Sequence, residues 1–157
     1  MKGQLFLALA LITGLARSTA QAETLTVPAT HGTIESALAA ALPGDRIEIT
    51  PGTYLESGLV LPAGVILVGM GTLPDETAID AQGGGRIFHV ESLVQASTLL
   101  NLTMTGGLAS GPTSYDQSGG AILVNNSFLQ INNCLFLDNG AQAHGGAVRA
   151  TNSTLII

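Results

Sequence analysis

The chain has very few cysteine and aromatic residues. Its 157 residues include one cysteine, Cys134, and no tryptophan, and aromatic residues make up 4% of the total. A single cysteine cannot form an internal disulfide, which excludes a disulfide-stapled secreted scaffold. Stability must therefore come from the burial of apolar side chains and from backbone pairing.

Basic residues are also scarce. After residue 22, three arginines stand against eleven acidic residues, which gives a formal charge of −8. Such an acidic chain disfavours nucleic acid and anionic membrane surfaces as partners. We therefore expect no binding to nucleic acid. We also expect no membrane insertion, because the long apolar run near the N-terminus is too short to span a bilayer.

That apolar run belongs to an export signal. Lys2 supplies a positive end, residues 5–16 form the apolar run, and Ala20-Gln21-Ala22 is a small-residue cleavage site. The sequence predicts a signal peptide over residues 1–22 and an exported protein, located outside the cell or on the outer-membrane surface.

Glycine is abundant, with 20 residues, and several of them mark an internal repeat. The segment that starts at Gly119 returns 26 residues later, starting at Gly145. The two openings are Gly119, Gly120, Ala121 and Ile122 in the first copy and Gly145, Gly146, Ala147 and Val148 in the second. A repeat of this length, made of short strands and turns, is typical of a solenoid.

The differences between the two copies predict which side chains point inward. Apolar positions are kept at Ile122, Val124, Leu129 and Ile131, which become Val148, Ala150, Leu155 and Ile157. Positions between them change character, as Leu123 does when it becomes Arg149. This alternation indicates strands with one buried face. We therefore expect Leu129 and Leu155 to stack in one interior column.

The chain before the repeat reads as one helix followed by short strands. Apolar spacing predicts a helix over Thr33–Leu42, with Thr33 as its cap and Pro43-Gly44 after its end. We expect residues 23–44 to cap residues 45–157. Strands are predicted at Thr24–Val27, Arg46–Thr50, Thr53–Glu56, Leu59–Leu61, Val65–Val68, Thr77–Ile79 and Arg86–Val90.

A loop is expected before the first repeat copy. Asn101 corresponds to Asn133, but 18 residues separate Asn101 from Gly119 and only 12 separate Asn133 from Gly145. The six extra residues fall in a polar, turn-rich stretch, so Leu108–Gln117 is predicted to be a loop that projects from one corner.

Two stretches resemble known families. Residues 33–56, with Pro43-Gly44-Asp45 and Pro51-Gly52-Thr53-Tyr54 around a strand, resemble the opening of right-handed parallel β-helix proteins of the pectin lyase-like fold. The Gly-Gly-Ala elements, with Phe136 and Asn139 of the Phe-Leu-Asp-Asn element, resemble the polymorphic outer-membrane protein repeat. The resemblance implies an all-β, right-handed parallel β-helix solenoid with an N-terminal capping α-helix. The chain ends within a predicted strand, so we expect an N-terminal fragment of a longer array.

The acidic residues give little sign of a metal site. In pectate-lyase-like enzymes, clustered carboxylates bind calcium, and calcium needs several oxygens that converge on one point. Here the candidates are scattered singly among turn residues, at Asp45, Asp80, Asp116 and Asp138. We expect no cofactor unless the protein is an enzyme, in which case calcium is possible. Asp116, in the predicted loop, is the remaining metal candidate.

No catalytic residue is identified among the other polar residues. Three histidines lie far apart, at His31, His89 and His144, and we expect them to be solvated or loosely hydrogen-bonded. We expect Arg86 and Arg149 to be lone surface charges. Cys134 falls on the inward series and reads as a small buried residue. Asparagines are expected at corners, where a left-handed backbone is needed, at Asn125, Asn126, Asn132, Asn133, Asn139 and Asn152.

Two functions follow from these expectations. The first is a secreted or cell-surface module that is not catalytic and contacts glycans or mediates adhesion through a regular acidic face. The alternative is a polysaccharide lyase, hydrolase or carbohydrate esterase that acts on acidic glycans, with its active site mostly outside this chain. A polysaccharide or a cell-surface glycan is the expected partner in both cases.

Overall fold

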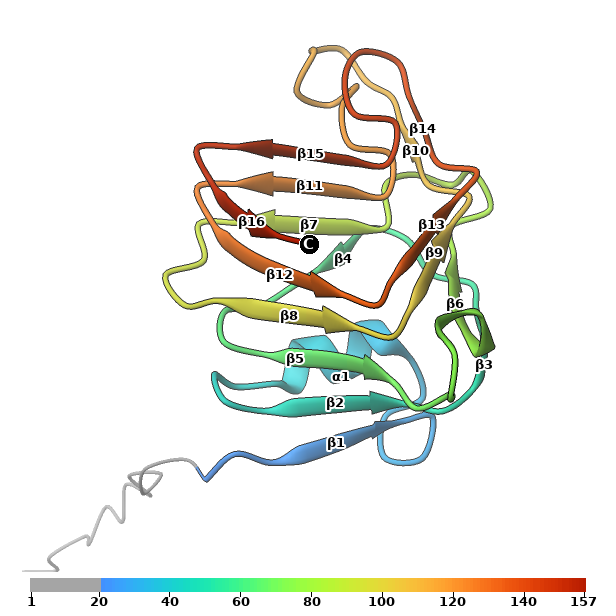
Figure 1. Cartoon of the computed structure of the whole chain (residues 1–157), viewed down its shortest axis with the longest axis vertical. Helices are drawn as coiled ribbons and strands as arrows, with labels where there is room; N and C mark the ends of the chain where they lie inside the picture. The colour runs from blue at the N-terminus through green and yellow to red at the C-terminus, as the bar shows by residue number, and fades with distance from the viewer. Residues whose placement is uncertain (1–20) are drawn as a thin grey trace, which may run out of the picture.

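The computed structural model describes residues 21–157, which are mostly β-strands (Figure 1). One α-helix, α1 (Ile34–Ala40), and one short 3-10 helix (Pro74–Glu76) occur in this range. The predicted signal peptide lies outside the described residues, apart from its last two. Within the described range, no helix is both long and apolar enough to cross a membrane.

The strands form three larger sheets and one small pair, and all the pairing is parallel. Sheet A contains β1 (Thr24–Val27), β2 (Arg46–Ile49), β5 (Ile66–Gly69), β8 (Ser97–Leu100), β12 (Phe128–Asn132) and β16 (Thr154–Ile156). Sheet B contains β3 (Gly52–Tyr54), β6 (Thr77–Asp80), β9 (Thr103–Thr105) and β13 (Leu135–Leu137). Sheet C contains β4 (Leu59–Val60), β7 (Phe88–Glu91), β11 (Ile122–Asn125) and β15 (Val148–Thr151). The pair is β10 (Leu108–Ala109) with β14 (Gly140–Ala141).

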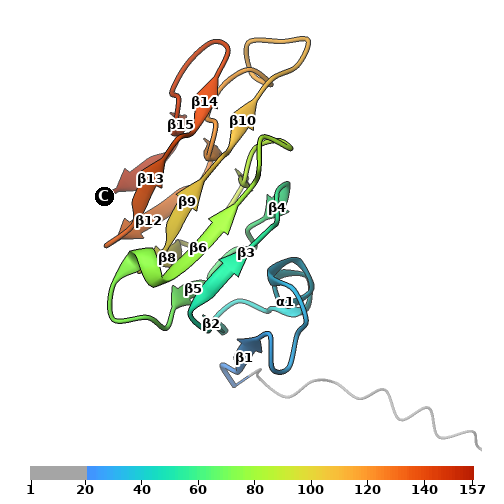
Figure 2. The same ribbon diagram turned by 90° about the vertical axis from the view of Figure 1, so that its right-hand side faces the viewer.

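From β2 onward, the chain visits sheets A, B and C in the same order again and again. Each visit adds a strand beside the previous one, so the chain advances from β1 at one end to β14 and β15 at the other (Figure 2). The protein is therefore β-rich with parallel sheets, as expected, and this order is compatible with a β-helix solenoid.

The register confirms the alignment of the two repeat copies. Ile122 pairs with Val148, and Leu129 pairs with Leu155. The earlier correspondence also holds, because Leu99 pairs with Ile131. Of the residues that the alternation placed inside, Ile122, Val124, Leu129 and Ile131 belong to one apolar cluster between the sheets, and Val148 and Leu155 pack against it. The prediction was wrong for Ala150 and Ile157, which are exposed. The two leucines thus share an interior column, as predicted.

Helix α1 is shorter than predicted, but its cap is the predicted one. Thr33 Oγ1 accepts a hydrogen bond from the backbone N–H of Ser36 at 3.1 Å. The Glu56 carboxylate also accepts bonds from the backbone N–H groups of Ile34 and Glu35, each at 2.8 Å. The helix ends at Ala40 rather than Leu42, because the backbone N–H of Leu42 donates to Asp45 Oδ2 instead. Its buried face packs on β1, β2 and β4.

Corners between strands use the expected left-handed backbone. Asn126 and Asn152 take φ values of 47° and 49° at equivalent corners, and Gly119 and Gly145 take 69° and 61°. Asn133 stacks on Asn101, donating from Nδ2 to Oδ1 at 2.8 Å. The prediction was wrong for three of the six asparagines. Asn125 and Asn132 end strands β11 and β12, and at Asn139 the preceding residue, Asp138, takes the left-handed backbone instead.

The predicted loop begins later than expected. Leu108 and Ala109 form β10 and pair with Gly140 and Ala141, so the chain leaves the sheets only from residue 110 onward and returns at β11. The pairing between distant segments could not be read from a two-residue strand, because two residues carry no periodicity. We call residues 110–118 the outer loop.

Candidate functional site on the outer face of sheet C

Arg86 anchors the outer loop and is not the lone surface charge that was predicted. The residue is only 8% exposed. Its Nε donates to the Gly119 carbonyl at 2.9 Å, and its Nη2 donates to the carbonyls of Ser118 at 2.6 Å and Asp116 at 3.0 Å. The prediction failed because these acceptors lie about 30 residues further along the chain. A buried guanidinium is tolerated when it is matched by acceptors in this way.

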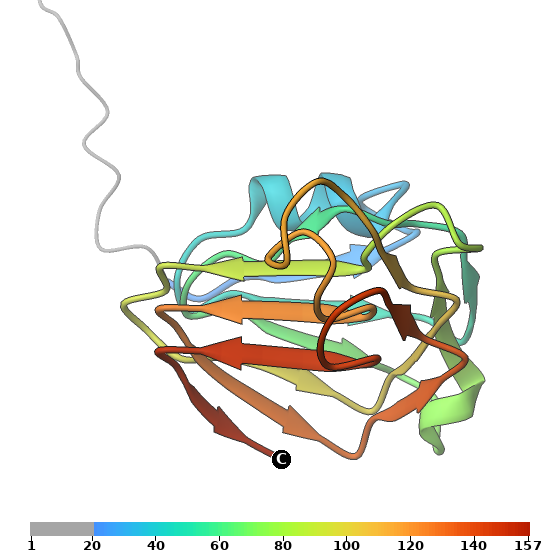
Figure 3. The ribbon, with the colours of Figure 1, turned by 90° about the horizontal axis from the view of Figure 1, so that it is seen from above.

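The outer loop is also fixed by contacts of its own side chains. Thr113 Oγ1 donates to Asp116 Oδ2 at 2.6 Å, and the Tyr115 hydroxyl donates to Glu91 Oε1 on β7 at 2.5 Å. The backbone N–H of Ala143 donates to the Gln117 carbonyl at 2.8 Å. Seen from above, the loop (orange) lies on the side of β7 and β11 that faces away from β8 and β12 (Figure 3). It therefore covers the outer face of sheet C.

This covering changes the environment of one row of side chains. Parallel register places Val60, His89, Leu123 and Arg149 in line across sheet C. Leu123 was predicted to be exposed but is fully buried, although it is outside the interior apolar cluster. Its neighbours explain this burial. Arg86, which lies beside His89, contacts the outer loop at Ser118, and so does Arg149. A side chain that faces outward is here buried by a loop.

His89 is half-buried on this face, between Val60 and Leu123 in the row. The Arg86 guanidinium Nη1 lies 3.4 Å from Nδ1 and 3.5 Å from Nε2 of the imidazole. Burial, and then the positive charge of Arg86, lower the pKa of His89 from its ordinary value of 6.5, while Glu91 acts in the opposite direction. The imidazole is therefore neutral at pH 7, with one nitrogen that donates and one that accepts.

The other two ionisable partners are also shifted. Burial raises the pKa of Tyr115 to about 12, and its hydrogen bond to Glu91 acts in the same direction. Tyr115 is thus a protonated donor at neutral pH. Burial lowers the pKa of Arg86, and the nearby Tyr115, Asp116 and Glu91 oppose that shift. Arginine remains charged because its ordinary pKa is far above 7.

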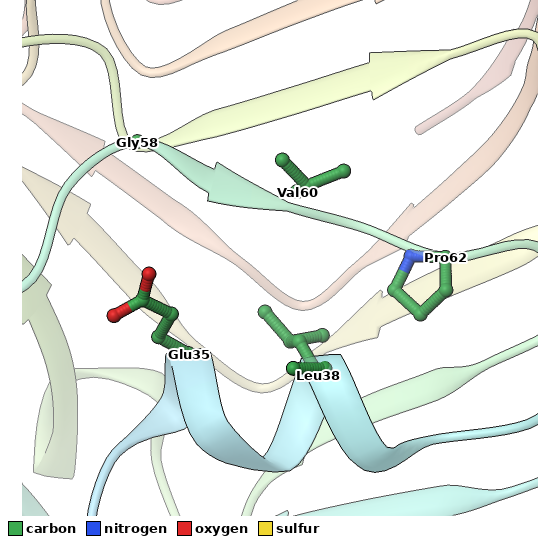
Figure 4. Close-up of a pocket in the computed structure, with 6 residues that line it drawn as sticks. Glu35, Leu38, Gly58, Val60 and Pro62 are labelled. Atoms are coloured by element: carbon green, nitrogen blue, oxygen red, sulfur yellow. The ribbon is translucent and has the colours of Figure 1, made fainter.

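Three hollows adjoin one another along this face. One of about 350 Å³ is lined by Gly58, Val60, His89 and Glu91. His89 also lines the next, of about 320 Å³, together with Arg86, Asp116 and residues of β10. Gly58 and Val60 also line a third, of about 290 Å³, which lies between β4 and the helix residues Glu35 and Leu38 (Figure 4). Each hollow shares lining residues with its neighbour, so we treat the three as one surface feature and call it the outer groove.

The outer groove combines polar groups of both kinds with apolar surface. His89, Arg86, Glu91 and Asp116 supply donors and acceptors, while Val60 is 68% exposed beside them. Such a mixture can bind a ligand that has hydroxyl groups and an apolar face.

The acidic residues that the sequence singled out are not brought together. Asp45 Oδ1 and Oδ2 accept from the backbone N–H groups of Glu23 and Leu42, and Asp80 Oδ1 accepts from that of Gln82. Asp138 adopts the left-handed backbone of a corner. Asp116 alone joins the outer groove, and within residues 21–157 no three potential metal ligands form a group.

The remaining candidates lie elsewhere. His31 accepts or donates at Thr30 Oγ1, at 3.0 Å, and His144 is exposed before the second Gly-Gly corner. Burial raises the pKa of Cys134, whose thiol lies 3.3 Å from the Asn132 carbonyl. Phe136 pairs with Met104 on sheet B, and Asn139 bridges to the Gly107 N–H and the Met104 carbonyl. Phe136 and Asn139 thus both contact the strand β9 region of the preceding pass of the chain.

Acidification is expected to weaken the folded protein through His89. Because its pKa is lowered on folding, the unfolded chain binds the proton more readily. The stability that is present above pH 6.5 is therefore lost as the pH falls from 6.5 through the lowered pKa. Urea unfolding at a series of pH values should show this slope reduced in H89Q and kept in H144Q, in which an exposed histidine is replaced. An identical slope in all three proteins would contradict the assignment.

Sequence reasoning missed Arg86, Glu91 and Tyr115 as members of this site. The sequence held two signals. The apolar residues of β7, which follows Arg86, align with those of β11, and the six extra residues lie between these two strands. An inserted loop beside an otherwise regular stack is a frequent position for binding residues.

Comparisons with known proteins add no assignment: no protein-family model, no curated protein and no solved structure matches this chain.

Proposed function

We propose that this chain is a secreted or cell-surface module of the right-handed parallel β-helix kind, with pectin lyase-like topology and polymorphic outer-membrane protein-type repeats. Its proposed role is to contact glycans along the outer groove without transforming them. The recurring order of sheets A, B and C supports the solenoid, and the N-terminal sequence pattern supports export.

The observation that carries the glycan proposal is the outer groove. Its lining includes residues from α1, β4, β7 and β10, and it combines hydrogen-bonding side chains with apolar ones. An extended polymer with hydroxyl groups matches such a surface better than a compact ligand does. The formal charge of −8 in the exported part disfavours nucleic acid as the polymer.

Electrophoresis through gels that contain a polysaccharide tests this proposal. We expect the protein to be retarded by at least one of a panel of neutral and acidic polysaccharides, and V60R to lose that retardation because the arginine fills two hollows. The matched control is V94R, since Val94 is 86% exposed and lines none of these hollows. Absence of retardation by the whole panel, or equal loss in both variants, would overturn the proposal.

One observation favours the alternative of a polysaccharide-degrading enzyme. The neutral imidazole of His89 lies beside Arg86 and lines the same hollow as Glu91, and a neutral imidazole can accept a proton from a bound substrate. Incubation with polygalacturonate and calcium, followed by absorbance of unsaturated product, tests a lyase. Assays for new reducing ends and released methanol test a hydrolase and an esterase. Turnover that H89A abolishes would replace the binding proposal.

A further inference from the structure

Arg86 has two donors that no oxygen in the described chain accepts. Its Nε and Nη2 are used by the carbonyls of Gly119, Ser118 and Asp116. Around Nη1, the hydrogen-bonding neighbours in residues 21–157 are the two ring nitrogens of His89, at 3.4 and 3.5 Å. Both distances exceed the usual range of 2.7–3.2 Å for such bonds. Nη1 therefore remains able to donate to an oxygen placed in the hollow.

Acceptors lie beside these donors. Asp116 accepts from Thr113 through Oδ2, and Glu91 accepts from Tyr115 through Oε1. The second oxygen of each carboxylate, Asp116 Oδ1 and Glu91 Oε2, has no hydrogen-bond partner among the described side chains and backbone groups. Both carboxylates line the outer groove on either side of His89. A ligand at His89 thus meets a guanidinium donor and carboxylate acceptors together.

This arrangement discriminates between neutral and anionic ligands. A hydroxyl group both accepts and donates, so a pair of adjacent hydroxyls can accept from Nη1 of Arg86 and donate to a carboxylate. An oxyanion only accepts, and it is repelled by Asp116 and Glu91. One guanidinium faces two carboxylates here, so the positive charge of Arg86 offsets this repulsion only in part.

Apolar side chains complete the site. Val60 is exposed beside His89 in one hollow, and Leu108 is 42% exposed in the other. A sugar ring presents C–H groups on one face and hydroxyls at its edge, and hollows of this size hold one such ring. We propose that the hollow between Arg86, His89 and Asp116 binds adjacent hydroxyl groups of a neutral sugar residue. This inference rests on the proposed glycan contact and narrows its ligand class.

The experiment compares neutral and acidic polysaccharides with two matched charge variants. The neutral probes are a β-glucan, a galactomannan and dextran, and the acidic probes are polygalacturonate and chondroitin sulfate. D116N removes the carboxylate but keeps an oxygen for Thr113, and D138N makes the same charge change in an exposed corner. Retention of the unfolding temperature shows that each variant is folded.

We expect a neutral polysaccharide to bind, and D116N to raise its dissociation constant about tenfold, the loss typical of one hydrogen bond to a charged group. H89A should weaken the same polysaccharide, whereas D138N and H144A should not. Stronger binding by D116N, or binding only to acidic probes, would overturn the inference and leave the glycan contact standing. Neutral binding that neither D116N nor H89A changes would also overturn it. Failure of all five probes would overturn the glycan contact as well.

Discussion

Replacing Arg86 with methionine is expected to lower the free energy of unfolding by about 3 kcal/mol. Methionine keeps most of the length but none of the donors, so the carbonyls of Asp116, Ser118 and Gly119 lose their shared partner. A polar group left unpaired in a buried place costs about 1–3 kcal/mol, and water entering beside the loosened loop recovers part of that cost. Urea unfolding of the purified protein measures the change.

A second readout shows whether the loss is local to the outer loop. Release of residues 110–118 should expose Leu123 and should make this loop the first site of limited proteolysis. Lysine at position 86 should recover little, because an ammonium group cannot match the guanidinium fork that reaches three carbonyls at once.

Arg149 gives the matched control for this prediction. It lies in the outer row with His89 and Leu123 and also reaches the outer loop, but its two side-chain contacts, with Thr151 Oγ1 and Ser118 Oγ, are each 3.4 Å long. Arg149→Met is expected to change stability by less than about 0.5 kcal/mol. If the two methionine variants unfold alike, Arg86 does not hold the loop.

The interior of this protein could be predicted from its sequence because it repeats. Copies that keep Ile122 and Leu129 apolar while Leu123 changes to arginine reveal the period of a strand, and the same comparison fixes the register. The cap of α1 was also readable, since Thr33 and the apolar spacing after it are local signals. Parallel strands then form where the aligned apolar residues can share one interior.

The outer face could not be predicted in the same way, because its contacts join segments that share no period. Arg86 bonds to residues 116, 118 and 119, and Tyr115 to Glu91, across about 24–33 positions of chain. Nothing near Arg86 in the sequence distinguishes a buried arginine from a solvated one. Glu56, which caps α1 from 22 residues away, escaped prediction for the same reason. The candidate site is built from such contacts, so only its position beside the inserted loop was foreseeable.

Alanine at Gly120 is expected to destabilise the protein by about 3 kcal/mol, near the upper end of what overpacking costs. A Cβ atom on Gly120 would meet the backbone oxygens of Gly146 and Gly140 at distances far inside van der Waals contact. Neither oxygen can move cheaply. The Gly120 N–H donates to Gly146 O at 2.9 Å, and the Gly140 N–H donates to Gly107 O at 2.8 Å. Either movement therefore breaks hydrogen bonds between neighbouring passes of the chain through the sheets.

The second repeat copy supplies a control at the equivalent position. A Cβ atom on Gly146 would lie 3.4 Å from Asn139 O, an ordinary contact, so Gly146→Ala should cost less than about 1 kcal/mol. Gly32, where nothing lies within 4 Å of such an atom, should tolerate alanine as well. Thermal and urea unfolding of the three variants therefore distinguish two reasons for glycine. One is the backbone conformation of the Gly-Gly motif, and the other is the close approach of neighbouring segments at Gly120. Equal losses at Gly120 and Gly146 would mean that the motif demands glycine by its own conformation. A loss of stability at Gly120 alone would mean that glycine is needed there because neighbouring passes of the chain approach so closely.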